Sequence, residues 1–200
     1  MSKPWIVSVL LGAAAAAFAQ QPANPVQRLR ASVESFDGTT LVVKERSGEV
    51  IRLALADNLA VNEVLPIELA AIQPHSFVGV GSMPQPDGTL RALEVLVFPE
   101  SARGSNEGHY PWDLQPGSMM TNATVADVAA APQGRQLKLR YKDGEKTVVV
   151  PPEAPVVTFK PGDRSLLVAG ARVIVTAQLR DGRPTALRVL AGRNGFTPPM

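Results

Sequence analysis

The chain has no cysteine, only two histidines, and few aromatic residues, which make up 5% of its 200 residues. Without cysteine it can form no disulfide, no thiolate metal site and no cysteine nucleophile. It also lacks a GxxxxGK[ST] phosphate loop, a GxGxxG motif after a predicted strand and a nucleophile elbow. We therefore predict that the protein is not an enzyme and uses no cofactor.

Long hydrophobic runs are missing except at the N-terminus. Lys3 precedes an apolar run from Ile6 to Ala17, and Ala17-Phe-Ala19 forms an A-x-A cleavage pattern before Gln20. This arrangement is typical of a secretory signal peptide. A membrane anchor is the alternative, but a spanning helix needs about 20 apolar residues. We predict cleavage near Ala19-Gln20, a periplasmic or secreted protein, and no transmembrane segment in the mature chain.

Similar sequence blocks lie on either side of residues 99–121. Five blocks recur in the same order, and they begin at Ala31 and Ala123, Thr40 and Gln136, Arg46 and Lys142, Ile72 and Leu167, and Asp87 and Asp181. We interpret them as two copies of one module, residues 28–98 and 122–192.

Each module has the pattern of β-strands. Leu137, Leu139 and Tyr141 alternate with charged residues, a period of two that buries one face of a strand. Asp-Gly and Ser-Gly pairs, such as Asp87-Gly88, supply the turns. We expect strands at about 29–36, 39–46, 49–55, 77–82 and 89–98 in the first module, with a short helical stretch over Leu65 to Ile72.

The predicted fold is all-β, with two tandem OB-like five-stranded barrels packed together through a long irregular connector. Two halves of a plain β-sandwich are the alternative. The predicted organisation is a signal peptide at 1–19, a disordered spacer at 20–27, the first barrel at 28–98, an aromatic and Pro-rich connector at 99–121, and the second barrel with a C-terminal tail at 122–200.

Charge is distributed unevenly along the chain. Residues 28–98 hold six Lys and Arg against nine Asp and Glu, whereas residues 122–200 hold twelve against six. This asymmetry favours attraction between the halves or an anionic partner for the second. Nucleic acid is not expected, because a barrel that binds single strands needs aromatic stacking platforms, and the aromatic residues here are dispersed. An envelope protein or glycan is the expected partner.

The connector holds the candidate binding residues: His109, Tyr110, Trp112 and Asp113. Amphipathic rings of this kind either pack a segment onto a barrel or recognise a partner. The alternative is a metal site formed by Glu107, His109 and Asp113, because carboxylate and imidazole are ligands for divalent ions. The other histidine, His75, is expected to occupy a turn. The sequence therefore favours a non-enzymatic periplasmic binding or scaffold protein, with a metal-binding accessory protein as the alternative.

The central segment also carries a family resemblance. The run Gly-His-Tyr-Pro-Trp-Asp-Leu, from Gly108, followed by Pro-Gly-Ser-Met-Met-Thr-Asn-Ala-Thr-Val, from Pro116, resembles the signature of a family of exported proteins from Gram-negative bacteria. Asp87-Gly-Thr-Leu-Arg-Ala-Leu-Glu-Val and the Thr-Pro-Pro-Met ending are similar to the same family. The resemblance implies small OB-like barrels and a periplasmic location, and it implies no activity.

Overall fold

The computed structural model describes residues 25–132 and 134–199, so the predicted signal peptide lies outside the described residues. The described part is all-β, as predicted, and none of its helices is long and apolar enough to cross a membrane. The strands are β1 (Gln27–Phe36), β2 (Thr40–Glu45), β3 (Val50–Pro66), β4 (Phe77–Pro84), β5 (Leu90–Val97), β6 (Gly108–Pro111), β7 (Met119–Ala131), β8 (Gly134–Tyr141), β9 (Gly144–Val150), β10 (Val156–Pro161), β11 (Arg172–Arg180) and β12 (Arg183–Gly192). The 3-10 helices are η1 (Leu69–Ala71), η2 (Glu100–Ala102) and η3 (Arg164–Leu166).

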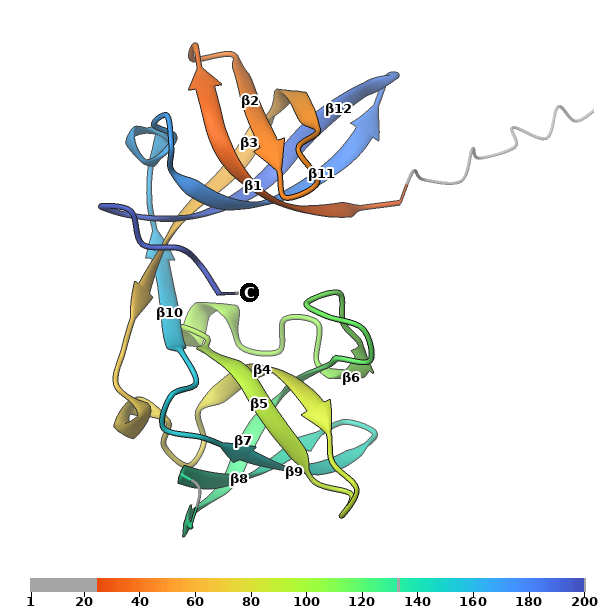
Figure 1. Cartoon of the computed structure of the whole chain (residues 1–200), viewed down its shortest axis with the longest axis vertical. Helices are drawn as coiled ribbons and strands as arrows, with labels where there is room; N and C mark the ends of the chain where they lie inside the picture. Colours follow the sequence, from red (N-terminus) through yellow and green to blue (C-terminus); the bar gives the residue numbers. More distant parts are fainter. Residues whose placement is uncertain (1–24, 133, 200) are drawn as a thin grey trace, which may run out of the picture.

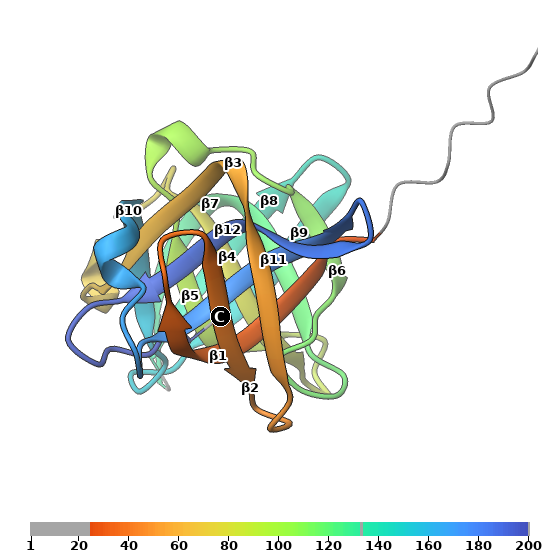
Figure 2. The ribbon, with the colours of Figure 1, turned by 90° about the horizontal axis from the view of Figure 1, so that it is seen from above.

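Two closed barrels of five strands lie one above the other (Figure 1). Barrel 1 is the ring β1-β2-β3-β12-β11, and Figure 2 looks down on it. Barrel 2 is the ring β7-β8-β9-β5-β4. Each ring consists of an antiparallel meander of three strands and a two-stranded hairpin, joined by one antiparallel and one parallel pairing. The two barrels therefore share one pairing pattern.

The prediction that each half of the chain forms its own barrel is wrong. Barrel 1 takes β1, β2 and β3 from the first half and β11 and β12 from the second. Barrel 2 takes its hairpin, β4 and β5, from the first half and its meander, β7, β8 and β9, from the second. The halves exchange their last two strands, so neither barrel corresponds to 28–98 or 122–192.

The exchange follows from the length of β3. This strand was expected to end near residue 55, but it continues to Pro66 and is 17 residues long. No Gly or Pro interrupts it before Pro66, so nothing turns the chain back onto barrel 1. Its second part still pairs with β12 of barrel 1 from Ala60 to Val64. On its other edge it pairs antiparallel with β10, where Val64 lies opposite Phe159. The two crossing segments thus form a small ladder between the barrels.

Three hydrophobic clusters of the described residues stabilise this arrangement. One fills barrel 1 and includes Leu41 and Leu53, and another fills barrel 2 and includes Leu137 and Leu139. The third lies between the barrels, and its buried members are Val64, Leu96, Val157, Phe159 and Ile174. The barrels are therefore held by an apolar interface in addition to the chain crossings.

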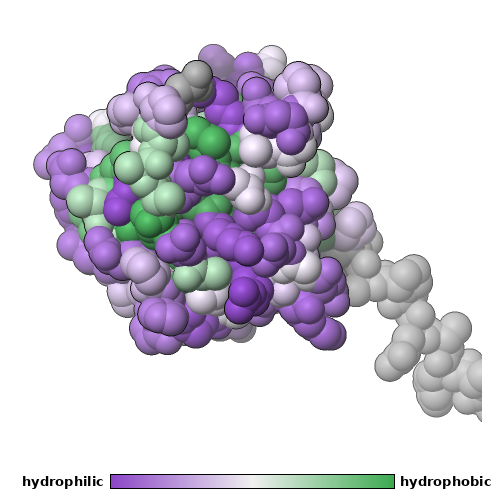
Figure 3. Space-filling model, turned by 90° about the horizontal axis from the view of Figure 1, so that it is seen from below, coloured by the Kyte–Doolittle hydropathy of each residue, from purple (hydrophilic) through white to green (hydrophobic). Residues whose placement is uncertain are grey.

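Ion pairs between the two halves accompany the crossing. The buried carboxylate of Glu63 on β3 contacts Arg193 at 3.0 Å and Lys160 at 3.6 Å, and Arg91 contacts Glu153 at 2.8 Å. The Glu63 contacts have the signs expected for an acidic first half and a basic second half, whereas the Arg91–Glu153 pair has the signs reversed. Seen from the barrel 2 end, the surface is largely hydrophilic around one hydrophobic area (Figure 3).

Candidate functional site

The connector does not link the two barrels. It leaves β5 and enters β7, and both of these strands belong to barrel 2. It is also more regular than expected, because it contains η2 and β6, and β6 pairs antiparallel with the start of β7. The connector is therefore an excursion from barrel 2.

The tip of this excursion carries Trp112 and Asp113. The main-chain N–H of Trp112 donates to the carbonyl of Ser118 at 2.8 Å, and the buried hydroxyl of Ser118 donates to the carbonyls of Gln115 and Trp112 at 2.7 and 3.0 Å. These bonds close residues 112–118 into a compact loop. This loop thus fixes the positions of Trp112 and Asp113, which directly follow the end of β6.

A buried asparagine fixes the first part of the excursion. The side-chain amide of Asn122 on β7 donates to the carbonyls of Ser105 and Asn106 and to the hydroxyl of Tyr110, each at 3.1 Å. Gly79 on β4 makes room for it, because a Cβ there would lie 2.6 Å from Oδ1 of Asn122. The absence of a side chain at Gly79 therefore helps to position Tyr110.

Asp113 joins the excursion to barrel 1. Both of its carboxylate oxygens accept from the guanidinium of Arg30 at 2.9 Å, and Arg28 lies 3.4 Å away. Hydrogen bonding to Arg30 is the main reason that the pKa of Asp113 lies below its usual value. The Arg28 guanidinium also lies 4.0 Å from the ring centroid of Trp112, a cation–π contact. Trp112 and Asp113 thus bind β1 of barrel 1 through Arg28 and Arg30.

Glu94 on β5 lies close to these contacts between Trp112, Asp113 and barrel 1. It was not among the site residues predicted from the sequence. It is 1% exposed, and neither carboxylate oxygen has a hydrogen-bond partner among the described residues. Burial raises its pKa from 4.5 to about 7, against the lowering effects of Arg30, Trp112 and Arg28. The indole N–H of Trp112 is close enough to influence Glu94 but falls outside hydrogen-bond geometry.

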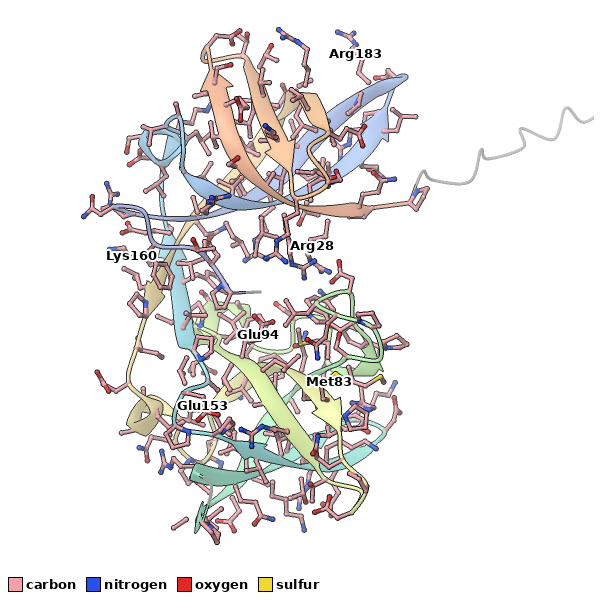
Figure 4. The ribbon with its side chains drawn as sticks, viewed as in Figure 1. Arg28, Met83, Glu94, Glu153, Lys160 and Arg183 are labelled. Atoms are coloured by element: carbon pink, nitrogen blue, oxygen red, sulfur yellow. The ribbon has the colours of Figure 1, made fainter. Side chains whose placement is uncertain are left out.

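Figure 4 shows Arg28 on the underside of barrel 1 and Glu94 on the facing side of barrel 2. Gly81 on β4 leaves the space that Glu94 occupies, because a Cβ there would lie 2.8 Å from Oε1 of Glu94. We name Arg28, Arg30, Glu94, Trp112 and Asp113 the junction cluster. It combines two cations with one ionised and one buried carboxyl group.

A hollow of about 400 Å³ opens beside the junction cluster. It is lined by residues from β1, β11 and the connector, and by Val26 just before β1: Val26, Gln27, Arg28, Tyr110, Pro111, Trp112, Asp113 and Thr176. The rings of Tyr110 and Trp112 meet edge to face, with centroids 6.2 Å apart. Three of the four predicted binding residues thus lie together in a hollow that only the packing of the two barrels creates.

The fourth predicted residue, His109, lies elsewhere. It alternates with Tyr110 along β6, so its side chain points to the opposite face of the strand. There its Nδ1 is 2.8 Å from the hydroxyl of Thr121, and its ring stacks on Tyr141. Burial, followed by the charge of Lys146, lowers its pKa. His109 does not belong to the hollow.

The predicted metal ligands are not brought together. Oε1 of Glu107 accepts from the main-chain N–H of Lys142 at 3.0 Å, His109 contacts Thr121, and Asp113 is paired with Arg30. Within residues 25–132 and 134–199, no three His, Asp or Glu side chains form a group that could hold a metal ion. The connector therefore gives no support to a metal site.

His75 adopts a left-handed turn conformation, with φ of 70°, and Gly170 has a φ of 82° in the corresponding turn of barrel 1. The main-chain N–H groups of both residues donate to carbonyls of the barrel meanders, those of Val125 and Val33, at 2.8 Å. His75 thus occupies the expected turn.

Comparisons with protein-family models, with curated proteins and with solved structures found no match to this chain.

Proposed function

We propose that the protein is a non-enzymatic binding or scaffold protein of the bacterial envelope, exported by its N-terminal leader. In this proposal both barrels are of the OB type and derive from one duplicated module. The hollow beside the junction cluster recognises a protein or an envelope glycan. The observation that carries the proposal is the placement of Tyr110, Trp112 and Asp113 together in one hollow, against Arg28 of the other barrel.

The chemistry of the hollow supports recognition. Tyr and Trp side chains offer large rigid surfaces with a polar edge, which suit both protein and sugar partners. The indole N–H of Trp112 has no hydrogen-bond partner among the described residues, and the Asp113 side chain is 48% exposed. The exposed part of the Asp113 carboxylate can accept from a partner, whereas the indole N–H is buried and leaves only the ring of Trp112 for contact.

Trp112 also provides the means of testing the proposal. The chain has two tryptophans, and the other is Trp5 in the predicted leader. The fluorescence of the mature protein therefore reports on this hollow alone. We expect the emission to shift when an envelope protein fraction or a set of envelope glycans contains the partner.

A second experiment compares how strongly the immobilised wild type and two variants capture that partner. Trp112→Ala should weaken capture of that partner by at least about tenfold, the range of an interface hot spot. Tyr141→Ala removes a half-buried aromatic ring on barrel 2 outside the hollow and should leave capture unchanged. Equal capture by wild type and Trp112→Ala, with both folded by circular dichroism, would contradict a recognition role.

A further inference from the structure

Barrel 1 carries a second hollow, of about 530 Å³, and Ser32 is one of the residues that line it. Ser32 on β1 lies opposite Lys44 on β2 and opposite Arg172 on β11. Side chains that are paired across neighbouring strands lie on the same face of a sheet. Two cations therefore flank a small hydroxyl side chain. The charged residues lining the hollow are Arg30, Glu34, Lys44, Glu45, Arg46 and Arg172.

Barrel 2 has a hollow of about 450 Å³ in the equivalent position. Its lining includes Thr124, which lies opposite Arg140 on β8 and Phe77 on β4. The equivalence is geometric, because the meander strands β1 and β7 both shift register just after these residues, between Val33 and Ser35 and between Val125 and Asp127. Ser32 thus corresponds to Thr124, and Lys44 to Arg140.

In barrel 2 this hollow holds a carboxylate of the chain itself. Glu107 from the connector lines it, and the main-chain N–H of Lys142 donates to Oε1 of Glu107 at 3.0 Å. Lys142 begins the turn Lys-Asp-Gly-Glu, and Arg46 begins the corresponding turn Arg-Ser-Gly-Glu in barrel 1. Within the described residues, no carboxylate bonds to the main-chain N–H of Arg46.

The barrel 1 hollow is the more basic of the two. In the described part of the chain Lys44, Arg46 and Arg172 form no ion pair. Among the residues that the structure describes, no aromatic side chain lines this hollow, so they provide no platform on which nucleobases or sugar rings stack. Glu34 and Glu45 at its edge would repel a polymer with a charge on every unit. These features favour a polypeptide with isolated acidic side chains.

We propose that the barrel 1 hollow binds a Glu or Asp side chain on an exposed loop of a partner protein, as the barrel 2 hollow binds Glu107. The carboxylate lies above Ser32, between Lys44 and Arg172, and accepts from the main-chain N–H of Arg46. This site is separate from the hollow at Trp112, so it stands or falls independently of the function proposed above.

The probe is a capped peptide with the sequence of Gly104–Pro111, which contains Glu107, and its control is the same peptide with Gln in place of Glu. Amide chemical shifts of the full mature protein are followed by NMR at millimolar peptide. We expect the Glu peptide to shift the amides of Ser32, Lys44, Arg46 and Arg172. We expect the Gln peptide to leave them unchanged.

Two variants localise the effect. Lys44→Ala/Arg172→Ala should weaken binding by about tenfold, because both charge contacts that flank Ser32 are lost. Arg183→Ala is the charge control, since Arg183 lies at the far end of barrel 1 (Figure 4) and outside the hollow. No shift at these four amides would overturn the site. Equal shifts with trigalacturonate or inorganic phosphate would overturn the assignment to a polypeptide carboxylate.

Discussion

Raising the pH from about 5 to about 8 should cost the folded protein about 3 kcal/mol of stability through Glu94 alone. The folded protein holds the Glu94 proton up to about pH 7, whereas the unfolded chain releases it near the usual pKa of 4.5. Between these values the folded state binds more protons, so the free energy of unfolding falls as pH rises. Above pH 7 the loss is complete.

The measurement is urea unfolding of wild type and Glu94→Gln near both pH values. Gln keeps the size of the side chain over Gly81 and cannot ionise, so the variant should lose about 3 kcal/mol less than wild type over this range. His109, whose pKa is lowered, contributes in the opposite direction, but it is present in both proteins and cancels. Equal pH dependence of the two proteins would show that Glu94 is not buried at the barrel interface.

Neither half of the chain should fold into a monomeric barrel. Residues 25–104 hold the meander of barrel 1 and the hairpin of barrel 2, and residues 105–199 hold the complementary strands. Each isolated half therefore leaves strand edges unpaired and cores open. Mixing the two should restore one complex with the native spectrum.

Circular dichroism and amide NMR of the separate and mixed halves check this prediction. We expect poor dispersion for each half and native dispersion for the mixture. A well-dispersed spectrum from monomeric 25–104 would mean that β4 and β5 can close the barrel of their own half. The strand exchange would then be unnecessary for folding.

The sequence predicted the strands well and their partners badly. Alternation and Asp-Gly or Ser-Gly turns located four of the five first-half strands to within two residues. The two halves share one sequence pattern, and both barrels share one strand-pairing pattern. The sequence pattern therefore does not say whether the hairpin of β4 and β5 pairs with the meander of its own half or with that of the other half. The signal for exchange was the stretch from Val50 to Leu65, which no Gly or Pro interrupts. The strand that results, Val50–Pro66, has 17 residues and exceeds the usual range of 3–10.

The candidate site was predicted in part, for a related reason. Tyr110, Trp112 and Asp113 stood out by composition, and they do lie together. Glu94 was missed because β5 shifts register between Ala92 and Glu94, so that Val95 faces the core of barrel 2 and Glu94 takes the outer face, which normally contacts water. Barrel 1 and the connector residues Trp112 and Asp113 bury it together. His109 was grouped with Trp112 by proximity in sequence, whereas the period of two along β6 separates them.

The exchange of strands between the halves is tested most directly by cutting the connector. A protease site inserted after Gly104 lies in an exposed loop, where a Cβ would meet nothing within 4 Å, so insertion should be tolerated. After cleavage, size-exclusion chromatography without denaturant should show a single species containing both fragments, which separate only in urea. Two folded fragments that elute apart without denaturant would contradict the account.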